Sequence, residues 1–147
     1  MVITDLNGNM DSCQALVTVL DTNNPVANCR NISVYLNSSG TISIDSSDID
    51  NGSTYSCGLA SMSLSKSNFD CSNKGPNNIT LTVTDIAGKS DSCQSIVTVI
   101  DAISPTPICR DTSIYINSLG SVTITSNFID NGSYDNCGID SVSINTS

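Results

Sequence analysis

The sequence contains no histidine, no tryptophan and no glutamate, so that all 14 of its acidic residues are aspartate. Without histidine and glutamate a serine nucleophile lacks its usual general base, which argues against an enzyme. Glutamate favours helix interiors whereas aspartate favours turns and caps, so the composition also argues against a helical protein. The absence of histidine and of any Cys-x-x-Cys pair argues against a zinc site.

Basic residues are also scarce, since five lysines and arginines stand against 14 aspartates and give a net charge of −9. Phosphate binding requires a basic face, so nucleic acid is not expected as a partner. No apolar run approaches the roughly 18 residues that cross a membrane as a helix, and no direct membrane insertion is expected. Met1 leads straight into strand-like sequence without a signal peptide. We therefore expect the chain to be an internal segment of a longer protein.

What the sequence does contain is a repeat with a period of 80 residues. Placing residues 1–67 on 81–147 gives 31 identical positions without an insertion or deletion. Within the repeat, short runs such as 32–36, 62–64 and 94–100 are rich in apolar β-formers and are bounded by Gly, Asn, Asp or Pro, with turns predicted at 37–40 and 74–77. This pattern predicts short antiparallel strands of a β-sandwich.

Two proline-bearing stretches, 21–25 and 101–107, interrupt the pattern and are predicted to be stiff linkers. They divide the chain into three parts. Residues 1–21 are the C-terminal hairpin of a preceding module, 22–101 are one complete module, and 102–147 are the N-terminal half of the next module. We expect an all-β protein of tandem immunoglobulin-like β-sandwich modules, stapled by disulfides.

Seven cysteines without a metal-binding pattern indicate disulfides, and therefore an extracellular or cell-surface location. The complete module holds four of them, Cys29, Cys57, Cys71 and Cys93. Four cysteines allow three pairings, and the sequence alone does not choose among them. We favour Cys29–Cys93, which ties the first strand to the last, together with Cys57–Cys71 across a short loop.

The favoured pairing leaves three cysteines, Cys13, Cys109 and Cys137, whose partners would lie outside the chain. An alternative pairing joins Cys13 to Cys29 and Cys93 to Cys109 across the two linkers, and leaves only Cys137 single.

Residues 82–89, TVTDIAGK, with Cys93, the strand 97–99 and Cys109, resemble the hyalin-repeat (HYR) type of immunoglobulin-like module. A further element at 48–59, with its copy at 129–139, is similar to repeats of very large surface adhesins of Bacteroidota, including the gliding-motility adhesins. The resemblance implies a disulfide from the first strand to the last. It also implies a non-enzymatic segment of a giant secreted adhesin, acting as an extended, force-bearing stalk in surface adhesion or gliding motility.

The expected partners of such a stalk are neighbouring modules of the same chain, surface polysaccharide or other copies of itself. Two alternatives remain open. One is a self-assembling extracellular filament subunit joined by strand exchange. The other is a spacer stalk of a secreted enzyme.

The composition requires no cofactor, and Ca²⁺ at the linkers is the one candidate. Linker 21–25 is similar to the acidic interdomain linkers of cadherin-like proteins, where carboxylate and amide oxygens coordinate Ca²⁺. The candidate ligands are Asp21, Asn23, Asn24, Asp5 and Asp101. The competing interpretation assigns these side chains to turns, which they cap through hydrogen bonds to the backbone. The repeated run 50–53 is likewise predicted to be a turn that needs positive φ.

Overall fold

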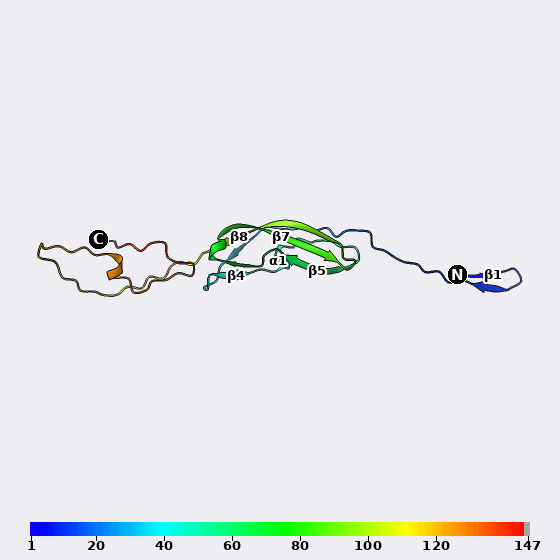
Figure 1. Cartoon of the computed structure of the whole chain (residues 1–147), viewed down its shortest axis with the longest axis horizontal. Coiled ribbons are helices and arrows are strands. Elements are labelled where there is room, and N and C mark those ends of the chain that lie inside the picture. Colours follow the sequence, from blue (N-terminus) through cyan, green and yellow to red (C-terminus); the bar gives the residue numbers. More distant parts are fainter. Residues whose placement is uncertain (146–147) are drawn as a thin grey trace.

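The computed structural model describes residues 1–145, which form a mostly β molecule of elongated shape (Figure 1). Residues 146–147 of the predicted third part lie outside the described residues. The strands are β1 (Val2–Thr4), β2 (Met10–Ser12), β3 (Ile32–Tyr35), β4 (Thr41–Ser43), β5 (Leu59–Leu64), β6 (Asn68–Asp70), β7 (Gly75–Asp85) and β8 (Ser90–Ile100). The helical turns are α1 (Ser46–Ile49), η1 (Cys71–Asn73) and η2 (Ser126–Phe128).

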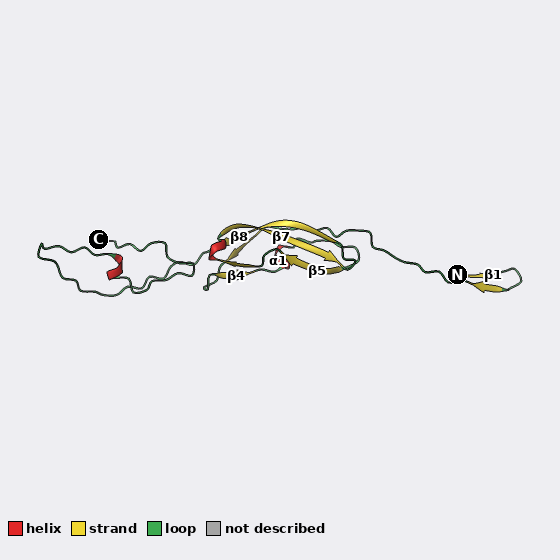
Figure 2. Ribbon diagram, viewed as in Figure 1, coloured by secondary structure: helices red, strands yellow, loops and turns green. Residues whose placement is uncertain are grey.

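Residues 22–101 form the central body of the molecule, which contains two sheets (Figure 2). One sheet has four strands in the order β3-β8-β7-β5, and the other pairs β4 with β6. All neighbours are antiparallel except β3 and β8, which run parallel. The predicted strands are therefore present, but the prediction that all are antiparallel is wrong for the first strand of the body, β3, which lies parallel beside the last, β8.

The hairpin of β7 and β8 is longer than the sequence predicted, because residues 74–77 were expected to form a turn. Gly75 and Pro76 instead pair with Val99 and Thr98 at the start of β7. Proline has no N–H to donate, and it is tolerated here because β5 pairs only with the later part of β7. The opposite end of the hairpin turns at Gly88, whose φ is +82°.

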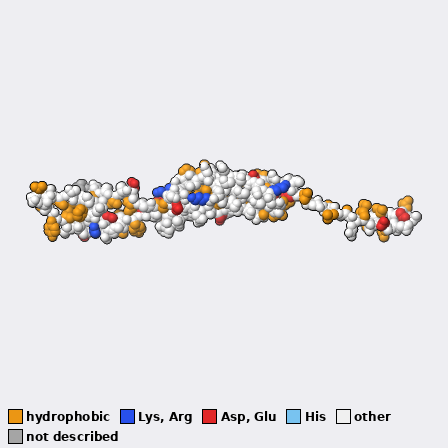
Figure 3. All heavy atoms as spheres, viewed as in Figure 1, with side chains coloured by type: hydrophobic (Ala, Val, Ile, Leu, Met, Phe, Trp, Pro, Cys, Tyr) orange, Lys and Arg blue, Asp and Glu red, His pale blue; other side chains and the backbone are white. Residues whose placement is uncertain are grey.

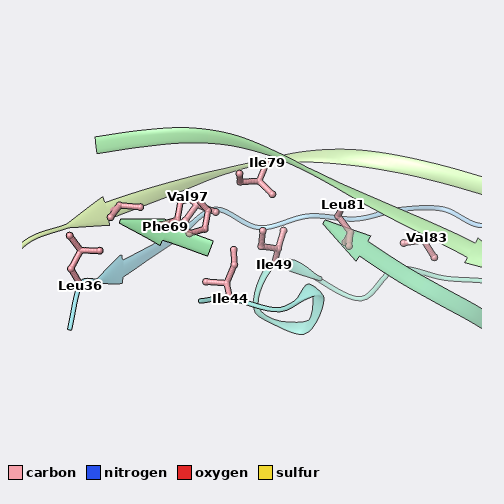
Figure 4. Close-up of a cluster of buried hydrophobic side chains, with 9 residues drawn as sticks. Leu36, Ile44, Ile49, Phe69, Ile79, Leu81, Val83 and Val97 are labelled. Carbon is pink, nitrogen blue, oxygen red and sulfur yellow. The ribbon is translucent and has the colours of Figure 1, made fainter. Parts of the chain in front are cut away.

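The core lies between the four-stranded sheet and the elements β4, β6 and α1, as Figure 4 shows. Alternate residues of β7 and β8 point inward, so the apolar side chains on one face are buried together. Phe69 of β6 and Ile49 of α1 close the cluster from the other side. Its members are Leu36, Ile44, Ile49, Phe69, Ile79, Leu81, Val83, Val97 and Val99.

The composition predicted no helix, but two short helical turns form in the body because aspartate caps them. Asp45 accepts a hydrogen bond from the Ser47 amide at 2.8 Å, and Asp48 accepts one from the Asp45 amide at 2.9 Å. Asp70 caps η1 in the same manner through the Ser72 amide. The guanidinium of Arg30 donates to the Asp48 carbonyl at 2.9 Å at the far end of α1. Short polar turns are thus satisfied locally, without helical periodicity.

The two ends of the molecule expose the apolar positions that the body buries (Figure 3). Val17 and Val19 are 80% and 90% exposed, whereas their counterparts 80 residues later, Val97 and Val99, are 0% and 2% exposed. At the other end, Ile116 is 68% exposed and its counterpart Leu36 is 4% exposed. Each end therefore leaves exposed the apolar positions whose counterparts are buried together in the body.

Candidate functional site

The disulfide Cys29–Cys93 confirms the pairing of the first strand region with the last strand. Cys93 belongs to β8, Cys29 precedes β3, and their Cα atoms are 5.8 Å apart. The Ala27 amide donates to the Asp91 carboxylate at 2.9 Å beside this bond. The bond therefore holds the first residues of the body against its last strand, β8. The alternative pairing of Cys29 with Cys13 and of Cys93 with Cys109 is wrong.

The second disulfide is Cys71–Cys137, and it corrects the predicted Cys57–Cys71 pair. Cys137, whose partner was expected outside the chain, is bonded within it across 66 residues, with Cα atoms 5.3 Å apart. The predicted pair fails because Cys57 and Cys71 lie at opposite ends of the body, with β5 and β6 between them. Cys57 is near Asp21 of the first linker, and Cys71 is near Asn136 of the C-terminal part.

The bond joins the central body to residues 102–145, and several polar contacts surround it. The Asn136 side-chain amide donates to the Asp101 carboxylate at 3.2 Å and to the Asn37 carbonyl at 3.3 Å. The Sγ of Cys71 lies 3.4 Å from the Asn136 carbonyl oxygen and 3.6 Å from that of Gly40. We call this set of contacts the joint. It consists of the turn 37–40, Cys71 and Asp101 on the body, with Asn136 and Cys137 opposite.

Gly40 allows the two sides of the joint to approach each other. It closes the turn that begins at Asn37, whose side-chain oxygen accepts from the Ser39 amide at 2.9 Å and from the Thr41 amide at 3.1 Å. A Cβ atom on Gly40 would lie 2.8 Å from the Cys71 Sγ. The φ of Gly40 is +71°, which also favours glycine. The sequence indicated a turn here but gave no sign that another part of the chain lies against it.

The two linkers begin in the same manner. Asp21 accepts from the Asn23 amide at 3.0 Å and from the Ser56 hydroxyl at 2.9 Å. Asp101 accepts from the Ile103 amide at 3.3 Å and from Asn136, which is the counterpart of Ser56. Hydrogen bonds lower the pKa of Asp21, the largest cause being the Cys57 thiol, followed by the Asn23 amide and the Ser56 hydroxyl. These aspartates therefore tie each linker to the body that follows it.

The five predicted calcium ligands do not meet at one place. Among residues 1–145, no three Cys, Asp, Glu or His side chains gather in a group that could hold a metal ion. Asp5 instead closes the turn between β1 and β2, accepting from the Asn7 amide at 2.9 Å and the Asn9 amide at 2.8 Å. Asn23 and Asn24 are exposed. The structure therefore favours the turn-capping interpretation of these residues.

The repeated run 50–53 is the turn that the sequence predicted. Asp50 accepts from the Ser53 amide at 3.0 Å and from its hydroxyl at 2.5 Å, and Gly52 has a φ of +82°. Asp130 makes the same contacts with Ser133 at the same distances. In both copies the carboxylate therefore caps the turn by accepting hydrogen bonds from it.

Among residues 1–145, Cys13, Cys57 and Cys109 are exposed and unpaired. None of the helices in the described part of the chain is long and apolar enough to cross a membrane. Comparisons with protein-family models, with curated proteins and with solved structures found no match for this chain.

Proposed function

We propose that the chain is a segment of an extended, force-bearing stalk, non-enzymatic and located on the cell surface. In this proposal residues 22–101 are one immunoglobulin-like module, and residues 1–21 and 102–147 are parts of its neighbours in a tandem array. Two sheets around one core and a disulfide onto the last strand support the module assignment. The resemblance to HYR-type adhesin repeats supports the role in adhesion or gliding motility.

The observation that carries the proposal is the Cys71–Cys137 bond, because it crosses from one module to the next. Noncovalent contacts between modules separate under load, whereas a disulfide keeps them joined. Stable disulfides form outside the reducing cytosol, which supports the proposed location. Two disulfides in series with the chain are what a tether under tension requires.

The two bonds limit how far the chain can be stretched. Between Cys29 and Cys137 the shortest covalent path crosses Cys29–Cys93, follows the 22 residue steps back from 93 to 71, and crosses Cys71–Cys137. At about 3.5 Å per residue this path reaches about 80 Å. With both bonds reduced, the path follows the 108 residue steps from 29 to 137. It then reaches about 380 Å.

Single-molecule pulling from the two chain ends tests the proposal. We expect the oxidised chain to lengthen by about 300 Å less than the reduced chain, from the contour lengths above. The matched control replaces both Cys71 and Cys137 by serine and keeps Cys29–Cys93. Its path from 93 to 137 reaches about 150 Å, which lies between the two and nearer to the oxidised chain. Equal lengthening of the oxidised chain and this control would show that the joint bears no load.

A second candidate function is the filament joined by strand exchange, and one observation favours it. The hairpin β1–β2 with residues 14–20 exposes the positions that β7 and β8 bury, and residues 102–145 expose the complementary positions. Cys13 and Cys109, the counterparts of Cys93 and Cys29, are both unpaired. The N-terminal hairpin of one copy would then complete the C-terminal part of another. Solution mass measurements decide, because a filament grows with concentration and loses its Cys13–Cys109 links in the Cys13→Ser variant.

A further inference from the structure

Cys57 lies in surroundings that repeat one side of the joint. It stands 80 residues before Cys137, and the residues before them, Ser56 and Asn136, each donate to the linker aspartate, Asp21 or Asp101. The backbone around the two cysteines also agrees. The isolated bridges Val26–Thr54 and Cys29–Asp50 recur as Thr106–Tyr134 and Cys109–Asp130, each shifted by 80 residues.

The other side of the joint differs between the two positions. Cys137 is bonded to Cys71, whereas Cys57 is exposed and unpaired among residues 1–145. In the 80-residue register, the counterpart of Cys71 that would meet Cys57 falls before Met1. At the opposite end of the chain, Gly120 repeats Gly40 with a φ of +75°, and nothing in the described residues lies within 4 Å of a Cβ placed there. In the described part of the chain, Cys57 therefore has no disulfide partner, and the turn at Gly120 lacks the close approach that Gly40 shows.

We propose that Cys57 is the receiving cysteine of a second covalent joint. Its partner is the η1-type cysteine, equivalent to Cys71, of another module of the same kind placed upstream. This inference rests on the tandem array of the proposed function and adds to it the covalent connection of every module to the next. In such an array each module carries one disulfide of its own and shares one with each neighbour.

The chemistry requires an oxidant, for which a small disulfide such as oxidised glutathione serves. The thiolate of the upstream cysteine attacks that disulfide, releases one glutathione thiolate and forms a mixed disulfide. The Cys57 thiolate then attacks the sulfur of the upstream cysteine and releases the second glutathione thiolate. Two protein thiols are thereby oxidised to one disulfide, one glutathione disulfide is reduced to two thiols, and the two protons that the protein thiols lose end on those glutathione thiols.

Asp21 of the first linker affects the reactivity of the Cys57 thiol. A hydrogen bond to the Asp21 carboxylate, with desolvation as the next cause, raises the pKa of Cys57. Only thiolate attacks a disulfide, so the raised pKa slows reaction of Cys57 with free disulfides in solution. A partner that docks through the contacts of the joint supplies a high local concentration and overcomes this slow reaction.

The test duplicates residues 22–101 in frame within the full chain, so that Asp101 of the upstream copy is followed by Thr22 of the downstream copy. The chain is folded in a glutathione redox buffer, alkylated under denaturing conditions and mapped by mass spectrometry. We expect a peptide pair that links Cys71 of the upstream copy to Cys57 of the downstream copy. The unpaired thiols then stay at the three that the original chain has, in place of five if the new pair stays reduced.

One result would overturn the inference and leave the proposed function intact. In that result both Cys29–Cys93 bonds and the original Cys71–Cys137 bond form, while the new pair stays reduced. The matched control, Cys57→Ser in the downstream copy, is expected to leave the upstream Cys71 alkylated. If the duplicated chain does not fold, the 147-residue chain with Cys137→Ser is used to test the inference in its place. Its released Cys71 should link to Cys57 of a second copy, and absence of that peptide pair overturns the inference.

Discussion

The Asn136 carbonyl oxygen lies only 2.6 Å from the place that a Cβ atom on Gly40 would occupy. The two residues are 96 positions apart and belong to the two parts of the molecule that Cys71–Cys137 connects. No side chain fits at residue 40 while the joint is closed. The smallest residue of the turn therefore sets how closely the next part of the chain can lie against the body.

Gly40→Ala should open the joint, with Gly120→Ala as its matched control. Both glycines have positive φ, at +71° and +75°, so both variants carry a similar backbone cost of about 1 kcal/mol. Only at residue 40 does the methyl group also collide with backbone. We expect dithiothreitol to reduce Cys71–Cys137 roughly tenfold faster in Gly40→Ala, for a collision of about 1–2 kcal/mol. Equal reduction rates in the two variants would contradict this account of the joint.

Removal of either disulfide should affect different parts of the molecule. Replacing Cys29 and Cys93 by serine opens a loop of 64 residues inside the body. On the chain-entropy treatment this lowers the free energy of unfolding by about 4 kcal/mol. Replacing Cys71 and Cys137 should change the unfolding midpoint of the body much less, because residues 102–145 add exposed rather than buried apolar side chains. Denaturant titrations of both double variants measure the difference.

The turns capped by aspartate should make the free energy of unfolding depend on pH. The Ser53 hydroxyl, more than the Ser53 and Gly52 amides, lowers the pKa of Asp50 below its ordinary 3.8. A carboxyl with a lowered pKa in the folded state stabilises it above the unfolded pKa, and the contribution disappears as pH falls through the folded pKa. Asp50→Asn should therefore destabilise the protein at neutral pH and have little further effect at about pH 2. An equal loss of stability at both pH values would show that the charge is not involved.

Asp21→Asn should make Cys57 more reactive. The Asp21 carboxylate is the largest cause of the raised pKa of the Cys57 thiol, so an amide at this position lowers that pKa and increases the thiolate fraction. We expect faster alkylation of Cys57 by iodoacetamide at about pH 8. Cys13 and Cys109 in the same sample are the internal controls, since both are exposed and unpaired. Equal acceleration at all three thiols would point to a general loosening of the structure.

Chelation of calcium should leave the unfolding midpoint unchanged. A ligand that binds only the folded state raises its stability, so removal of a bound ion would lower the midpoint. Asp5, Asp21 and Asp101 already accept hydrogen bonds from their own turns and from Ser56 or Asn136. A lower midpoint after addition of a chelator would restore the linkers as calcium sites.

The alternating apolar residues of β3, β4, β7 and β8 were sufficient to predict the strands, because one face of each is buried and the other is not. The turns η1 and α1 were missed, since a capping aspartate stabilises them locally without any apolar period. The register of 80 residues predicted where the core positions recur. The interpretation of the two ends as parts of modules that lack their covering strands implied that the apolar positions there lie exposed, as Val17 and Ile116 do.

The pairing of Cys71 could not be predicted, because spacing along the chain favoured the nearer Cys57. One signal was present in the sequence. A predicted strand at residues 62–64 lies between these two cysteines. Because a strand is extended, the residues before and after it lie far apart along the sheet. Asn136 was missed for a different reason, since its role depends on contacts with Asn37 and Asp101 that only the folded joint creates.

The Cys71–Cys137 bond also determines what happens when the chain is cut. Residues 102–107 are exposed, so this linker is open to proteases. A cut at any peptide bond between Cys71 and Cys137 leaves both fragments attached to each other through sulfur. A nicked molecule therefore keeps its length and its distal parts until a reductant reaches the joint. Cleavage and release become two separate events, and only the second separates the two fragments.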